Sequence, residues 1–170
     1  MSESDTSEAE RKRVRPATPM SALSMGWVTF VSTSSGARPS ASVRMMTVGF
    51  VRSGSTSTGT WKAALRAAGA AVAATDDVID GRAENAFCSV RPPGHHATRD
   101  ETMGFCFFNN VAIAARHALD VRGLKRVAIV DFDVHHGNGT EDIVAGDERI
   151  LMVSFFQHPF YPEGGSTRTE

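Results

Sequence analysis

One stretch of the chain combines carboxylates and imidazoles in a pattern suited to metal chemistry. The sequence DFDVHHGNG begins at Asp131, directly after the apolar run RVAIV. Residues two apart on a strand face the same side, so Asp131 and Asp133 are expected to project together from an otherwise apolar element. Buried like charges are costly unless a cation or hydrogen-bond donors compensate them. If the strand stays extended, His135 continues the alternation, and a carboxylate with an imidazole suits Zn²⁺ or another divalent transition metal. We therefore predict a metal-binding hydrolase loop.

A second stretch places two titratable side chains side by side. His95 and His96 follow Arg-Pro-Pro-Gly, a sequence typical of a constrained turn. In such a pair one imidazole can act as a base and the other as an acid or electrostatic partner. Each needs an acceptor that orients its other ring nitrogen, and Asp131 and Asn138 are the candidates. A solvated turn is the alternative interpretation.

Aromatic residues lie between these two stretches. The segment 104–108 reads GFCFF, and at least one of its rings is expected in the core. If Phe105 instead faces the polar residues, it would line a narrow channel for an aliphatic chain. His117 lies within an amphipathic helical pattern and is interpreted as structural or exposed. His158 and Tyr161 lie in a proline-flanked loop, where they are candidate residues of the site's rim.

The elements that must position these side chains alternate along residues 58–155. Apolar patterns, turns and cap residues predict, in order, a helix over 61–79 capped by Thr60, a strand over 86–90, a helix over 111–121 capped by Asn109 or Asn110, a strand over 126–132, a short helix over 141–146 capped by Thr140, and a strand over 149–155. This rhythm predicts an α/β fold with three layers and a parallel sheet. Ligands bind beyond the carboxyl ends of such strands, and there the unusual polar residues fall.

Composition limits the remaining possibilities. The chain has 170 residues, with 18 basic and 19 acidic side chains and a net charge of -1, which gives no global attraction to nucleic acid or anionic membrane. Two cysteines form no disulfide framework, and no apolar run approaches a membrane span. We expect a soluble, cytoplasmic protein.

Residues 1–57 are rich in polar residues and are interpreted as a poorly defined, partly disordered segment. The apolar patches near Trp27 and Val48 are possible strands without an evident partner. Residues 58–170 are interpreted as a partial catalytic domain.

Three segments taken together resemble a known family. AFCSVRPPGHHA, MGFCFFNNVAIAA and RVAIVDFDVHHGNGTEDI look like successive signature blocks of the zinc-dependent histone deacetylase and acetylpolyamine amidohydrolase family. The resemblance extends from about Trp61 to about Tyr161. Asn138 and the stretch SFFQHPFYP look more like the class II and bacterial branch. The resemblance implies an arginase-like three-layer α/β fold and hydrolysis of an acetylated amine, with acetyl-lysine on a protein or peptide, or an acetylpolyamine, as substrate.

The same resemblance implies a role for each matching residue. Asp133 and His135 would be zinc ligands, and His96 would be the general base for a metal-bound water. His95 would be its companion on Asp131, with Asn138 orienting His96. The substrate channel would be formed by the remaining matches, namely the Gly104 carbonyl and the rings of Phe105 and Tyr161. A structural monovalent cation, K⁺ in this family's pattern, would lie against Asp131, Asp133, His135, Ser154 and Phe155.

Two features of the family have no counterpart in this sequence. The third zinc ligand, an aspartate, and the tyrosine that stabilises the oxyanion both come later in the family's pattern, and nothing after Tyr161 matches them. We therefore expect a truncated member that is inactive or impaired.

Two other functions remain open at this point. In one, the chain is a non-catalytic deacetylase fragment that serves as a binding module. In the other, RVAIVDFDV is the D-x-D motif of a magnesium phosphohydrolase, with Asp131 as nucleophile and Asp133 as acid or base.

Overall fold

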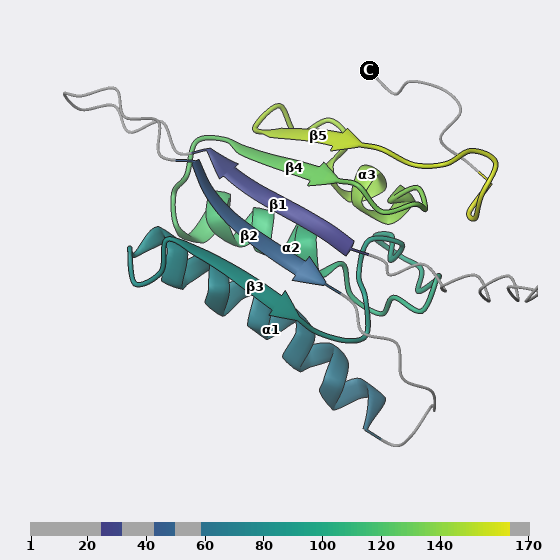
Figure 1. The fold of residues 1–170 in the computed structure, drawn as a ribbon, viewed down its shortest axis with the longest axis horizontal. Helices are drawn as coiled ribbons and strands as arrows, with labels where there is room; N and C mark the ends of the chain where they lie inside the picture. Colours follow the sequence, from purple (N-terminus) through teal and green to yellow (C-terminus); the bar gives the residue numbers. More distant parts are fainter. Residues whose placement is uncertain (1–24, 32–42, 50–58, 164–170) are drawn as a thin grey trace, which may run out of the picture.

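The computed structural model describes residues 25–31, 43–49 and 59–163 (Figure 1). The predicted polar tail at the beginning of the chain lies outside these residues. The strands are β1 (Met25–Val31), β2 (Val43–Gly49), β3 (Asn85–Ser89), β4 (Val127–Asp131) and β5 (Ile150–Ser154). The helices are α1 (Thr60–Ile79), α2 (Asn110–Arg116) and α3 (Asn138–Val144), and a π-helical turn, η1 (His117–Val121), continues α2.

The strands form one sheet in the order β3-β2-β1-β4-β5. β2 and β3 are parallel, β4 and β5 are parallel, and β1 runs antiparallel to both β2 and β4. The α/β class is confirmed, but the described sheet is mixed and not purely parallel. The carboxyl ends of β2, β3, β4 and β5 therefore share one edge of the sheet. We call this edge the rim; as predicted, three of these strands lead to the polar loops.

The two apolar patches of residues 1–57 are strands that sequence inspection left without a partner. β1 pairs with β2 in register from Met25 opposite Gly49 to Val31 opposite Val43, and β1 also pairs with β4. The stretch between β1 and β2 is too long for a short hairpin turn, so no local turn sequence marks their pairing. The pairing of β1 with β4 joins residues far apart along the chain. The division between 1–57 and 58–170 stays a prediction, although strands from both segments lie in this sheet.

α1 begins one residue earlier than predicted. Gly59 occupies the position before the first helical residue, and no side chain caps the helix there, so the prediction that Thr60 caps it is wrong. The buried face of α1 is made of small residues, Ala64, Ala67, Ala71, Thr75 and Val78. Small side chains let the helix approach the sheet and α2 closely. No described helix has the length and apolar character needed to cross a membrane.

The helix predicted over 111–121 divides into α2 and η1. Asn109 is the cap, because its side chain accepts a hydrogen bond from the backbone N–H of Ala112 at 3.0 Å. His117, at the start of η1, lies 2.7 Å from Asp76 of α1, and Arg122 pairs with the same carboxylate. Hydrogen bonds from His117 and then Arg122 hold the pKa of Asp76 below its usual range. The interpretation of His117 as structural is thus consistent with an ion-pair cluster that joins α1 to the end of η1.

α3 also begins earlier than predicted. Gly137 precedes its first residue, and Thr140 lies inside the helix, fully buried, so the prediction that Thr140 caps it is wrong. The Thr140 side chain instead contacts the Asn109 side chain. α3 therefore begins within the DFDVHHGNG motif itself, and its first turn is part of the candidate site.

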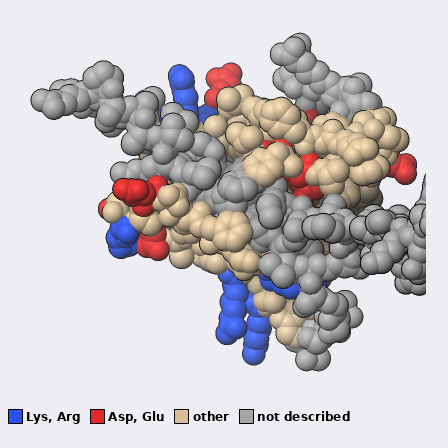
Figure 2. Space-filling model, in the orientation of Figure 1, with Lys and Arg blue, Asp and Glu red and all other residues tan. Residues whose placement is uncertain are grey.

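The core lies between the sheet and one layer of helices. α1 packs on β2 and β3, α2 on β1 and β4, and α3 on β5, while α2 contacts both other helices (Figure 1). Val127, Ile129 and Ile150 point into this core. On the opposite face, Phe87 and Leu151 are exposed, and mostly uncharged side chains cover the region of β4 and β5 in Figure 2. The second helical layer of the predicted three-layer sandwich is not found among the described residues.

Two glycines in open surroundings give opposite expectations for stability. A Cβ added at Gly69, in the middle of α1, or at Gly123, after η1, meets no atom within 4 Å, but Gly123 has φ +71° and Gly69 has helical geometry. Gly69→Ala should raise the free energy of unfolding by about 0.5–1 kcal/mol, because alanine loses less entropy in a helix. Gly123→Ala should lower it by about 1–2 kcal/mol, because a Cβ disfavours the left-handed conformation. Urea unfolding of the two variants measures both changes, and an equal effect in both would contradict this account.

Candidate active site at the rim of the sheet

The first histidine of the pair is held by a buried carboxylate. His95 Nδ1 lies 2.9 Å from Asp131 Oδ2, and the two side chains are 5% and 3% exposed. A carboxylate only accepts hydrogen bonds, so His95 Nδ1 is the donor. Nε2 is itself buried and has no partner among the described residues. The other oxygen of Asp131 accepts a hydrogen bond from the backbone N–H of Asp133 at 3.1 Å.

The second histidine is held in the same way by an amide. His96 Nδ1 lies 2.8 Å from Asn138 Oδ1, and the Asn138 amide nitrogen contacts the sulfur of Met103 at 3.3 Å. The rings of His95 and His96 are stacked at a tilt, with centroids 4.0 Å apart. The structure therefore brings together the two predicted pairs, His95 with Asp131 and His96 with Asn138.

The two imidazoles have different affinities for a proton. Burial alone lowers the pKa of His95, but the hydrogen bond to Asp131 and the charges of Asp131 and Asp133 outweigh it and raise that pKa. Burial and the neighbouring His95 lower the pKa of His96 to about 4, which Asn138 opposes only in part. His96 is thus neutral near pH 7, with Nδ1 engaged and Nε2 left as the second ring nitrogen.

Asp133 and His135 lie together, but not for the reason predicted. β4 ends at Asp131, so the strand does not stay extended as far as His135. Instead, Asp133 Oδ1 accepts a hydrogen bond from the backbone N–H of His135 at 2.7 Å and lies 3.0 Å from His135 Nδ1. A local turn around the aspartate side chain, not strand alternation, brings the two groups to one place.

The pair fits two positions of a divalent metal site. Asp133 is 2% exposed, yet its Oδ2 is buried without a partner among the described residues. A buried charged oxygen without a donor is costly, and a cation removes that cost. No third Asp, Glu, His or Cys joins them within the described part of the chain.

The end of β5 supplies two of the five residues predicted for a monovalent cation, Ser154 and Phe155. Ser154 is the register partner of Asp131 across the β4–β5 pair, and the backbone N–H of Phe155 donates to the Asp131 carbonyl at 2.8 Å. The Ser154 hydroxyl oxygen is buried without a partner in the described structure. The predicted set thus lies together in space.

Aromatic rings border the histidines on the solvent side. The Tyr161 ring lies edge-on to His96 with centroids 5.0 Å apart, and Phe160 lies 6.2 Å from His135. Phe105 is 85% exposed. His158, predicted as a rim residue, is exposed, and no contact joins it to the histidine pair in the described structure.

Glycines allow the loops to approach each other closely. A Cβ at Gly104, where φ is +55°, would lie 2.3 Å from the His96 ring, and one at Gly137 would lie 2.4 Å from Asp131 Oδ2. A Cβ at Gly139 would lie 2.3 Å from the Ala97 carbonyl oxygen. The role of Gly104 is therefore visible as close packing against His96, whereas the role of its carbonyl toward a substrate stays a prediction.

Asn109 ties these loops together, a function that the sequence did not reveal. Its amide nitrogen donates to the Ala97 carbonyl and to Thr140, each at 3.1 Å, while its carbonyl oxygen caps α2. The backbone N–H of Thr140 also donates to the His95 carbonyl at 3.0 Å. Its position as a helix cap was predicted, but its contacts with residues far along the chain carry no local signal.

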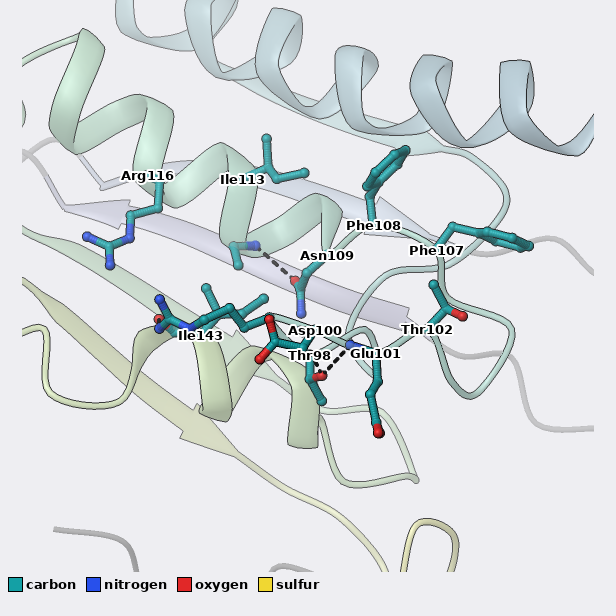
Figure 3. A pocket seen from close by; sticks show the side chains of 12 residues that line it. Thr98, Asp100, Glu101, Thr102, Phe107, Phe108, Asn109, Ile113, Arg116 and Ile143 are labelled. Atoms are coloured by element: carbon teal, nitrogen blue, oxygen red, sulfur yellow. Dashed lines mark hydrogen bonds between the residues drawn. The ribbon is translucent and has the colours of Figure 1, made fainter.

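A pocket of about 530 Å³ lies on the helical side of these loops (Figure 3). It is lined by residues of the 98–102 loop, by residues 107–109 and one side of α2, and by Ile143 of α3. Asn109 lies in its wall and points toward the loop that follows His96. None of the predicted site residues lines this pocket, so it is separate from the candidate site.

Fold and site together define an α/β protein with a pair of buried histidines and two buried aspartates at the carboxyl ends of its strands. The model of the histone deacetylase domain matches residues 7–170, and the chain belongs to this family.

The chain is similar to several deacetylase-family proteins. A type-2 histone deacetylase 2 of Dictyostelium discoideum is 47% identical over 114 residues, covering 61% of this chain and 7% of that protein. A histone deacetylase-like amidohydrolase of Pseudomonas aeruginosa is 46% identical over 108 residues, covering 64% and 28%. The crystal structure of the HDA15 HD domain matches with a TM-score of 0.59 and 47% identity, covering 61% of this chain and 31% of that one. The chain thus spans under a third of the length of these relatives.

The packing of Gly139 gives a direct test of the site's architecture. Gly139→Ala should lower the free energy of unfolding by about 1–3 kcal/mol, because the added methyl group meets backbone atoms that cannot rotate away. Thermal melting of the full chain measures the loss, with Gly69→Ala as the control for adding a methyl group where space is open. A Gly139 variant as stable as the parent would show that α3 does not contact the His95–Ala97 backbone as described.

Proposed function

We propose that this chain is part of a deacetylase domain that hydrolyses the acetyl amide of acetyl-lysine or of an acetylated polyamine, with Zn²⁺ held by Asp133 and His135. One observation carries the proposal: two imidazoles, each oriented through Nδ1, stand beside a buried carboxylate oxygen that has no partner among the described residues. Family membership supports the reaction class. Substrate and metal are our inference.

Different residues of the chain have different roles in such a hydrolysis. Bound Zn²⁺ would lower the pKa of a water molecule and polarise the acetyl carbonyl. Asn138 orients His96 so that Nε2, the nitrogen left by its hydrogen bond, takes a proton from the attacking water. Asp131 holds His95 in the matching orientation and favours its protonated form, which suits electrostatic support of the developing negative charge.

The surroundings of His96 suit a narrow substrate channel. Tyr161 lies beside the His96 ring, and Gly104 lies against the same ring from the next loop. Phe105 follows Gly104 and is exposed. We propose that Phe105 and Tyr161 contact the aliphatic stem of the substrate, which has no charge near its acetylated end.

The geometry weighs against the magnesium phosphohydrolase alternative. A nucleophilic aspartate needs a free oxygen, but both oxygens of Asp131 accept hydrogen bonds and the side chain is 3% exposed. The non-catalytic alternative has a specific observation in its favour. Asp133 and His135 are joined by no third acidic, histidine or cysteine ligand in the described part of the chain. Two protein ligands make a weak zinc site.

An acetyl-lysine peptide assay separates these functions. The full chain, loaded with Zn²⁺, should release acetate, and His96→Ala should lower kcat/KM by about 10²–10⁴-fold while leaving bound zinc unchanged. Asp133→Ala should remove the zinc itself. Zinc content by mass spectrometry and amine release by fluorescence are the two readouts, and acetylpolyamine in place of peptide tests the substrate class.

Lys62→Ala, an exposed change on α1, is the matched control and should leave turnover unchanged. Zinc binding without turnover would favour the non-catalytic binding module. Phosphate release from an aryl phosphate in the presence of Mg²⁺ would contradict the deacetylase proposal.

A monovalent cation at Ser154 is a separate part of the proposal. Its hydroxyl oxygen is buried, has no partner among the described residues, and lies next to Asp131 in register; it suits K⁺, which prefers oxygen ligands. Potassium chloride should raise the melting temperature above that in tetramethylammonium chloride of equal ionic strength, because a ligand that binds only the folded state stabilises it. Ser154→Ala should reduce that difference. Equal melting temperatures of the parent chain in both salts would rule the cation site out.

A further inference from the structure

One buried imidazole of the DFDVHHGNG motif has no part in the proposed reaction. His136 is 6% exposed, and its Nε2 lies 2.8 Å from Glu141 Oε2 in α3. Because a carboxylate only accepts, Nε2 is the donor of this contact. The other nitrogen, Nδ1, is buried and unpartnered among the described residues.

The contact with Glu141 explains why a polar ring occupies this position. The His136 ring also packs on Phe156, with centroids 4.6 Å apart, but an apolar side chain of similar size would make that contact as well. Burying an imidazole costs free energy unless it is hydrogen-bonded. Among the described residues, the directional bond to Glu141 is thus the interaction that a phenylalanine at this position would lose.

Glu141 lies in a helical turn that is already fixed to the site. Its backbone N–H donates to the Gly137 carbonyl at 3.1 Å, and the preceding N–H, that of Thr140, donates to the His95 carbonyl at 3.0 Å. The side chain of Glu141 therefore extends from a turn anchored on the catalytic histidine loop to the loop that carries the proposed metal ligands.

The ligand loop needs such an anchor. β4 ends at Asp131, so Asp133 and His135 lie on irregular backbone. Beyond the turn within the loop, Val134 accepts a hydrogen bond from the N–H of Gln157 at 2.9 Å. His136 follows His135 directly, so a fixed His136 side chain restricts the peptide unit that joins His136 to the proposed ligand His135.

We propose that His136 is a positioning residue for the metal site: its bond to Glu141 and its contact with Phe156 fix the loop that presents Asp133 and His135. Carboxylate–histidine pairs near a metal commonly hold ligands in place, and their loss weakens metal binding. The inference rests on the proposed function, because it needs a metal at Asp133 and His135.

Metal affinity of the full chain tests the proposal without an activity assay. The Kd for Zn²⁺ and for Co²⁺ is measured by competition with a chelator, together with the visible absorption of the Co²⁺ form and the melting temperature of the metal-free protein. Glu141→Ala and His136→Phe should weaken binding by about 10–100-fold and alter the Co²⁺ spectrum. Glu141→Gln keeps a hydrogen-bond acceptor and should restore most of the affinity. Glu148→Ala, an exposed glutamate just beyond α3, is the matched control and should bind as the parent does.

The outcomes separate this inference from the proposed function. If Glu141→Ala lowers only the melting temperature and binds metal as the parent does, the pair merely stabilises the fold and the inference is wrong. If the parent chain binds neither metal, the proposed function fails and the inference fails with it. Should His136→Phe not fold, the comparison of Glu141→Ala with Glu141→Gln still decides, because the Glu141 side chain is 28% exposed and only the alanine variant leaves His136 Nε2 without its acceptor.

Discussion

The bond between His95 and Asp131 is the constraint on which the rest of this site depends. It joins the loop after β3 to the end of β4, two strands that are separated in the sheet by β2 and β1. Both partners are almost fully buried, so neither exchanges its partner for water. A second bond, between His96 and Asn138, runs in parallel from the same loop to the start of α3. Because a residue of a different element holds each imidazole, each of the two adjacent rings has a fixed orientation.

Close backbone contact makes this pairing possible. Gly137 lets the chain pass against Asp131, and Gly139 lets the first turn of α3 lie on the His96–Ala97 peptide. With larger residues at those positions, α3 would have to move away and would carry Asn138 with it. The glycines and the hydrogen-bonded pairs therefore depend on each other, because the hydrogen bonds form only where the backbones approach as closely as glycine allows.

The sequence predicted the parts of this arrangement that depend on local pattern. Apolar runs located β3, β4 and β5, and polar residues at their ends located the rim, because periodicity and strand direction act over a few residues. The resemblance to the deacetylase family also implied the pairing of His95 with Asp131 and of His96 with Asn138, whereas the residues alone named the two acceptors without assigning them. The caps Thr60 and Thr140 were predicted wrongly: glycine precedes each helix, and Thr140 serves a tertiary contact. The antiparallel β1 and the Asn109 contacts depend on residues far apart along the chain, which no local pattern reports.

Charge compensation distinguishes the two aspartates of the motif and gives the site its chemistry. Asp131 has donors on both oxygens, from His95 and from the peptide of Asp133, so its negative charge is accommodated by the protein. Asp133 has donors on one oxygen only, and its other oxygen is buried without a partner in the described structure. The two residues were predicted to act together because they alternate along a strand, but the strand ends between them and their environments diverge. Asp131 thereby becomes the group that orients an imidazole, and Asp133 becomes the group that a cation would satisfy.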